Sequence, residues 1–228
     1  MIPLPPAMTE VMVPDCFSPS ALGSSAGCRL KLVVTSIPRA GSQERLAAGP
    51  EAAVGTLLHR VLERAGQPDG LSPDDIFQQE YERAVEELRR DPRRAHFAEL
   101  ASTRSLTEWN RTKQWVLARA AQQVSPARPA PTTNERGGPR LTGPEVGFQS
   151  TTLRLRGKAD RIRKLGPNEF EVRDFKTGVT LDERGDVKVE IALQLWAYGF
   201  MLLERRPGSE VRLVVDDGYE RIRPECPW

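Results

Sequence analysis

Hydrophobic residues recur every three or four positions in several stretches of the chain, and this spacing predicts amphipathic helices. The stretch 51–65 carries such a stripe on Val54, Leu57, Leu58, Val61 and Leu62. Ser18 followed by Pro19 predicts the start of a short helix nearer the amino terminus. The stretch 189–203 is almost wholly apolar and is followed by Pro-Gly, which predicts a buried helix.

Two further helices are predicted in the middle of the chain. One covers 72–90 and begins with Ser, Pro and two acidic residues. The other covers 106–124, and its apolar spacing predicts a core position for Trp109 rather than a role in stacking on bases. We expect both to form a helical insertion at about 72–124, followed by a flexible loop over 125–143 that is rich in Pro and Gly.

Strand-type composition begins after this loop. Strands are predicted over 145–148, 151–164 and 169–176, and the turn-forming residues Gly, Pro and Asn at 166–168 should reverse the chain between the last two. The segment VRLVVDDGYERI should close the fold as a strand, a turn and a short return strand. The pattern therefore predicts an α/β fold with a sheet in its carboxyl-terminal half.

The predicted hairpin carries two carboxylates and a lysine. It brings Asp160 close to Asp174, and alternation along the second strand puts Lys176 on the same face as Asp174. Two neighbouring carboxylates repel each other unless a cation lies between them, so a metal site is one interpretation. The other is a solvent-facing ladder of charges on a polar strand, and the hairpin alone leaves both open.

Four other polar residues are open to a packing interpretation. His59 lies beside the apolar stripe of its helix and, taken alone, is more typical of a packing residue than of a ligand; His96 has the same interpretation. Gln194 and Tyr198 share one face of the buried helix, where they could satisfy backbone groups in the core or serve a site.

Composition limits the class of protein. The chain has 228 residues, 39% hydrophobic and 28% charged, with a net charge of +2 that does not by itself indicate nucleic acid. Its three cysteines are widely separated, which favours a reducing compartment. The first fifteen residues contain four prolines and neither a basic segment nor a continuous apolar one. We therefore expect an extended or disordered tail over 1–15, a single domain over 16–228 and a cytoplasmic protein.

Four motifs occur in a fixed order along the chain. GTLLHRVLE spans 55–63, GKAD spans 157–160, DFKTG spans 174–178, and Gln194 is followed by a tyrosine four residues later. This order resembles the RecB-like branch of the PD-(D/E)XK nuclease superfamily, whose members carry GxxxHxxLE, GxxD, DxK and QxxxY in these places. The resemblance implies a restriction-endonuclease-like mixed sheet flanked by helices.

The resemblance also implies a ligand set. His59, Asp160 and Asp174 would bind a metal ion together with the backbone carbonyl of Phe175, and Glu145 falls where relatives often carry a further glutamate. These ligands suit Mg²⁺, with Mn²⁺ as a substitute. Catalytic roles would fall to Asp160, Asp174, Lys176, Gln194 and Tyr198. DNA phosphates would be contacted by Arg154, Arg156, Arg161, Arg163 and Arg173.

The chain departs from many of these relatives in its cysteines. Those relatives bind a [4Fe-4S] cluster through one cysteine near the amino terminus and three near the carboxyl terminus. This chain has Cys28 at the early position and only Cys226 at the late one. Four thiolates are needed for such a cluster, so we predict none here.

The leading hypothesis is a metal-dependent DNA nuclease, an exonuclease acting on ends or single strands in repair, recombination or defence. DNA is the expected partner, and a helicase or another subunit of a nuclease complex a further one. Two alternatives are a non-catalytic DNA-binding or scaffolding module of a helicase-nuclease or CRISPR-type complex, and a metal-binding hydrolase with another substrate. No GxxxxGK[ST] motif for a helicase motor occurs in the sequence.

Overall fold

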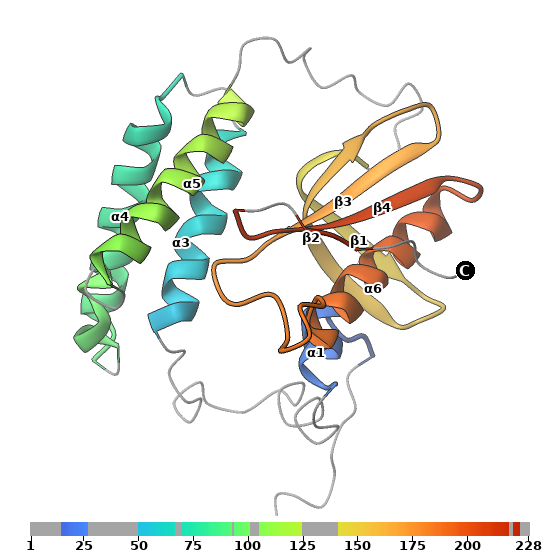
Figure 1. The fold of residues 1–228 in the computed structure, drawn as a ribbon, viewed down its shortest axis with the longest axis horizontal. Coiled ribbons are helices and arrows are strands. Elements are labelled where there is room, and N and C mark those ends of the chain that lie inside the picture. Colours follow the sequence, from blue (N-terminus) through green and yellow to red (C-terminus); the bar gives the residue numbers. More distant parts are fainter. Residues whose placement is uncertain are drawn as a thin grey trace, which may run out of the picture.

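The computed structural model describes residues 15–26, 50–66, 70–92, 94–100, 105–124, 141–218 and 221–223. Figure 1 shows a group of helices beside a mixed sheet, and a further long helix lies against the strands. The helical group consists of α3 (Pro50–Ala65), α4 (Pro73–Arg90), the 3-10 turn η3 (Ala95–Phe97) and α5 (Leu106–Val124). The helix against the strands is α6 (Val189–Arg205), and the short α1 (Pro19–Ser24) packs on it.

Side-chain caps fix where the predicted helices begin. The Ser72 hydroxyl accepts a hydrogen bond from the Asp75 amide at 3.1 Å, and the Ser18 hydroxyl does the same for Ala21 at 3.0 Å. At the start of α5, Ser105 and Glu108 cap each other's backbone amides, at 3.3 and 3.1 Å. The predicted helices over 72–90 and 106–124 are confirmed.

The sheet has five strands in the order β1 (Gly143–Ser150), β2 (Leu155–Lys164), β3 (Glu169–Phe175), β4 (Glu210–Asp216) and β5 (Arg221–Arg223). Neighbouring strands are antiparallel except for β3 and β4, which are parallel and are joined through α6. The hairpin predicted between β2 and β3 is present, and the Leu165 amide closes it on the Glu169 carbonyl at 2.9 Å. The predicted α/β class, a mixed sheet with helices, is confirmed.

One strand boundary was predicted wrongly. Residues 151–154 form a turn, not the start of β2. The Ser150 hydroxyl accepts a hydrogen bond from the Leu153 amide at 3.0 Å, and Arg154 takes a left-handed conformation with φ of 52°. The turn joins β1 to β2 as a second hairpin.

The two faces of the sheet pack against different helices. Val172 belongs to a cluster with α6, whereas Phe175 belongs to a cluster with the helical group. These two residues are three apart on one strand, so they point to opposite faces. Trp109 lies in the helical cluster beside Phe77 and Tyr81 and is 9% exposed, which confirms its core position.

Several predictions fall on residues outside the described ranges. They include almost all of the predicted tail, most of the loop over 125–143, and both Cys28 and Cys226. The predicted domain limits and the absence of an iron-sulfur cluster stay predictions. Within the described ranges, none of the helices combines the length and apolarity needed to cross a lipid bilayer.

Candidate active site

The β2–β3 hairpin brings Asp160 to the end of β3. Arg161 pairs with Arg173, so the same register carried one residue further sets Asp160 opposite Asp174. The Phe175 amide donates a hydrogen bond to Asp160 Oδ2 at 2.8 Å. The closeness of the two strands at this point, predicted from the turn between them, is thus confirmed.

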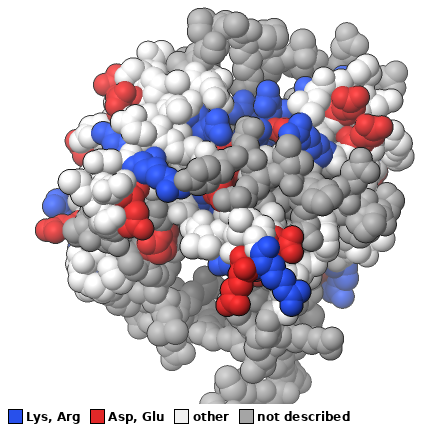
Figure 2. All heavy atoms as spheres, in the orientation of Figure 1, with Lys and Arg blue, Asp and Glu red and all other residues white. Residues whose placement is uncertain are grey.

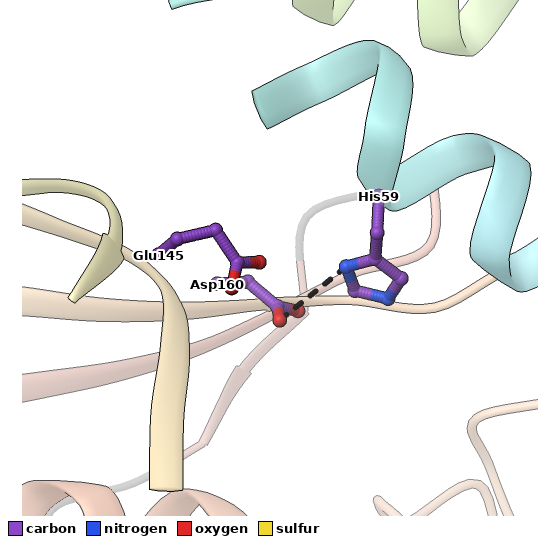
Figure 3. Close-up of side chains that lie close together, drawn as sticks. All are labelled: His59, Glu145 and Asp160. Carbon is purple, nitrogen blue, oxygen red and sulfur yellow. Dashed lines mark ion pairs between the residues drawn. The ribbon is translucent and has the colours of Figure 1, made fainter. Parts of the chain in front are cut away.

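A histidine and a glutamate approach Asp160 from two other elements. Figure 3 shows His59 reaching from α3 toward the strands, with its Nδ1 3.4 Å from Asp160 Oδ1. Glu145 lies on β1 between residues that pair with Arg161 and Ala159, which places it opposite Asp160. Ligand atoms of His59, Glu145 and Asp160 all lie within 4.8 Å of one another.

Glu145 has an unusual backbone conformation. Its φ of 51° lies in the left-handed region, which non-glycine residues with long side chains rarely adopt. Such a conformation costs on the order of 1 kcal/mol or more and occurs often at functional sites. Within β1, it accompanies a carboxylate that is turned toward two other potential ligands.

The electrostatics of the three side chains fit a divalent cation. Burial lowers the pKa of His59, which favours the neutral imidazole that a metal requires. Burial, and then the neighbouring charge of Asp174, raise the pKa of Asp160 well above its usual range. Burial also raises the pKa of Glu145. A cation would relieve the cost of ionising both carboxylates, and one imidazole with carboxylate oxygens is a donor set for a divalent metal ion.

Asp174 is engaged by a lysine and a glutamine. Lys176 Nζ lies 2.8 Å from Asp174 Oδ2, and Gln194 Nε2 donates to Asp174 Oδ1 at 3.1 Å. Lys176 also donates to Gln194 Oε1 at 3.2 Å, which closes a triangle of three side chains. Asp174 is therefore adjacent to the group of three potential ligands but does not belong to it.

Lys176 is an ammonium ion in this environment. Burial alone would favour the neutral amine, but the attraction of Asp174 and Asp160 outweighs burial and the pKa of Lys176 rises. In the metal-free protein, the raised pKa keeps the amine protonated near neutral pH. Its chemical use is as a fixed positive charge and hydrogen-bond donor.

Tyr198 is buried and donates its hydroxyl to the carbonyl of Lys158 at 2.5 Å. Burial, followed by the charges of Asp160 and Asp174, raises its pKa, so it remains a phenol. The nearby Gly157 has no room for a side chain, because a Cβ there would lie 2.7 Å from Pro19 Cδ and 3.2 Å from the Tyr198 hydroxyl. Tyr198 thus holds the strand that carries Asp160, as the packing interpretation of this residue stated.

The five arginines predicted to contact DNA lie in different environments. Arg173 is 6% exposed and paired with Glu171 and Asp216 inside the protein, so the prediction of a DNA contact is wrong for this residue. Arg163 and Arg156 are exposed on β2, Arg161 is half-buried, and Arg154 lies in the turn before β2. For these four, a DNA contact stays a prediction.

A cleft of about 1180 Å³ opens onto His59 and Lys176. Its walls are the amino-terminal halves of α3 and α5 and the segments that follow β3 and β4. The residues that the sequence did not single out here are Ser105, Glu108, Arg111, Thr112, Trp115 and Thr180. Helical periodicity indicated that α5 has a buried stripe. No pattern in the sequence indicated which other residues of this helix would line a cleft.

The cleft is not strongly basic. Among its described lining residues, Arg111 and Lys176 supply positive charge, and Glu51, Glu108 and Asp217 supply negative charge. Figure 2 shows basic and acidic residues intermixed over the described part of one face, without a continuous basic surface. Positive charge on the described part of this face is therefore local, in line with the net charge of +2.

Comparison with known proteins identifies a family for the chain. The family model described as the PD-(D/E)XK nuclease superfamily matches residues 16–224. No curated protein matches the chain significantly.

Proposed function

The chain belongs to the PD-(D/E)XK nuclease superfamily, and on that premise we propose that it is a metal-dependent DNA nuclease of the RecB-like branch, formed by a single domain over 16–228. The observation that carries the proposal is the group of His59, Glu145 and Asp160 beside the Asp174–Lys176 pair, with His59 and Lys176 both lining one cleft. The family implies phosphodiester chemistry, and these side chains supply the groups that it needs.

Each residue has a distinct role in this proposal. His59, Asp160 and Glu145 hold a divalent cation, with Asp174 and the Phe175 carbonyl completing its environment. When bound, the cation would polarise a scissile phosphate and lower the pKa of a water molecule. Lys176 stabilises the added negative charge on the phosphate.

Gln194 keeps Lys176 in place and Tyr198 supports the strand beneath. The Gln194 amide accepts from Lys176 and donates to Asp174, so it fixes the direction in which the ammonium points. A lysine held in this way loses little side-chain entropy when it meets a phosphate oxygen. We assign Gln194 and Tyr198 to positioning, which modifies the catalytic role predicted for them.

The substrate class follows from the cleft and the family. We propose that DNA ends or single strands enter the cleft between α3 and α5, where Arg111 offers a guanidinium to a backbone phosphate. The exposed arginines of β2 would contact the DNA outside the cleft. A helicase or another nuclease subunit, in a repair, recombination or defence pathway, would supply such ends.

Cleavage assays test the proposal directly. Linear and circular DNA, single- and double-stranded, are incubated with the protein in Mg²⁺, Mn²⁺ or chelator. Asp174→Ala and Lys176→Ala should lower the rate of cleavage by roughly 100-fold or more, whereas Lys164→Ala, an exposed lysine on β2, should leave it unchanged. Cleavage at the wild-type rate in both site variants would refute the assignment, and DNA binding without cleavage in any condition would favour the scaffold alternative.

A further inference from the structure

We infer that α5 positions the catalytic end of β3 through a buried contact with Asp216, which makes Trp115 and Arg119 positioning residues for the metal site. The inference rests on the proposed function for its catalytic meaning. Its structural part concerns a group of charged and aromatic side chains on the opposite side of β3 from Asp174.

Asp216 is the centre of this group and is 0% exposed. Its Oδ1 accepts hydrogen bonds from Trp115 Nε1 at 3.0 Å and from Arg119 at 3.3 Å. Its Oδ2 lies 2.8 Å from Arg119 Nε and 2.8 Å from Arg173 Nη1. The Gly218 amide adds a further bond to Oδ1 at 3.2 Å. Burial of a carboxylate is costly unless it is fully paired, and here both oxygens have cationic or N–H partners.

The same residue is paired with the end of β3 through its backbone. Asp216 lies opposite Phe175 in the parallel β3–β4 pair, and its carbonyl accepts the Lys176 amide at 3.0 Å. The Trp115 ring meets the Phe175 ring edge to face, with centroids 6.3 Å apart. Helix α5 therefore holds both the side chain of Phe175 and the strand that pairs with it.

Phe175 connects this contact to the metal site. Its amide donates to Asp160 Oδ2 at 2.8 Å, and its two neighbours in the chain are Asp174 and Lys176. A small displacement of this residue would move the Asp160 carboxylate, the Asp174 carboxylate and the Lys176 ammonium together. Partners that orient metal ligands in this way typically change metal affinity or activity by about 10–100-fold when they are removed.

The placement on α5 is specific. Trp115 and Arg119 are four residues apart, so they lie on one face of the helix, and Arg111 and Thr112 continue that face into the cleft. One face of α5 thus forms a wall of the cleft at its amino-terminal end. Toward its carboxyl-terminal end, the same face contacts Asp216 on β4. The insertion is in this way part of the active site and not an appendage to it.

The test compares two mild variants with a matched control in the full chain. Trp115→Phe removes the indole N–H but keeps an aromatic ring, and Arg119→Met removes the guanidinium but keeps much of the apolar stem. Glu80→Gln is the control, because Glu80 is also buried, at 4% exposure, and is paired with Arg64 at 3.1 Å within the helical group. Arg119→Lys serves as the conservative rescue.

The first measurement is hydrogen exchange of the metal-free proteins at residues 174–178. Trp115→Phe and Arg119→Met should exchange several-fold faster there than the wild type, while Glu80→Gln should not. The second is Mn²⁺ titration by calorimetry, in which both variants should bind about tenfold more weakly and Arg119→Lys should recover part of the loss. Activity at low Mn²⁺ should fall in parallel and recover at high Mn²⁺.

Different results would overturn different statements. Unchanged exchange at 174–178 would show that α5 does not hold this strand end. Faster exchange with unchanged Mn²⁺ affinity would overturn the positioning role. An equal loss of affinity in Glu80→Gln would do the same, because the contact of α5 with Asp216 would then contribute only to the general stability of the fold. A wild type that neither binds Mn²⁺ nor cuts DNA would refute the proposed function, and the exchange comparison would still decide the structural part.

Discussion

Strands β2 and β3 and the helical group contribute to the candidate site in different ways. The strands present Asp160, Asp174 and Lys176 within one hairpin, so the positions of these groups follow from local chain reversal and alternation. Helix α3 supplies His59, which lies about a hundred residues before Asp160 in the sequence. Helix α5 provides a wall of the cleft and binds the Asp216 carboxylate. In the proposed function, the strands supply the two aspartates and the lysine, and the helices supply the histidine and the wall of the cleft.

Removing the lysine tests the strand side of the site. It should give the largest loss of cleavage rate. Lys176→Met is expected to lower kcat for DNA cleavage by roughly 10²–10³-fold, the usual loss when one electrostatic contact to the transition state is removed. Mn²⁺ affinity should hold or increase, since Asp174 loses the ammonium that neutralises it. Single-turnover kinetics with calorimetry in parallel measure both. A variant that loses Mn²⁺ binding would instead assign Lys176 to the architecture of the metal site.

Substitution of the histidine tests the helical side. His59→Ala should weaken Mn²⁺ binding by roughly tenfold or more, because a direct ligand should matter no less than the groups that orient one. Cleavage should recover as Mn²⁺ is raised, in contrast to Lys176→Met. His96→Ala is the matched control, since His96 is exposed on η3. Equal behaviour of the two histidine variants would exclude α3 from the metal site.

Arg111 tests whether the insertion contacts DNA. Arg111→Ala should raise KM, or Kd for a short single strand, by roughly fivefold, equivalent to about 1 kcal/mol, with kcat little changed. The slope of log Kd against log salt concentration should fall by roughly 0.7 for a single strand. Arg156→Ala, exposed on β2 and outside the cleft lining, provides the comparison. A larger effect from Arg156 would place the DNA on the sheet.

The smallest expected effect is on the pH dependence of stability when Asp160 is replaced. This measurement concerns folding alone and does not depend on DNA cleavage. Because the pKa of Asp160 is raised above its ordinary 3.8, the folded chain holds this proton more tightly than the unfolded chain. Its contribution to stability is present at low pH and is lost as pH rises through the folded-state pKa. In chelator, Asp160→Asn should therefore have the higher Tm at pH 8, and the difference should shrink toward pH 4.

Two controls sharpen that measurement. Asp186→Asn replaces an exposed carboxyl and should not alter the pH profile. Saturating Mn²⁺ should reverse the order of the two Tm values, because the wild-type carboxylate binds the ion more tightly than the amide that replaces it. If Asp160→Asn has no advantage at pH 8, the carboxylate is not held at an energetic cost in the free protein.

Local patterns predicted some features well because the responsible forces act over short distances. The helix starts at Ser18 and Ser72 follow from side-chain caps, and the β2–β3 hairpin follows from its turn residues. The predicted strand start at 151 was wrong because these residues form a turn. The hydrogen bond from the Leu153 amide to the Ser150 hydroxyl and the left-handed conformation of Arg154 stabilise this turn, and the polarity pattern reveals neither. Arg173 was misplaced because alternation does not reveal which face of a strand will be covered.

The sequence by itself determined the elements, the hairpin and the four motifs, since each depends on spacing along the chain. Only the tertiary structure decided that Glu145, and not Asp174, lies within ligand distance of both His59 and Asp160. The packing also decided that Asp174 is held by Lys176 and Gln194, and that Tyr198 supports a backbone carbonyl. It also decided that α5 meets β4 at Asp216. The reason is physical: ligand distances and buried ion pairs depend on how separate elements pack, and the polarity of neighbouring residues does not specify that packing.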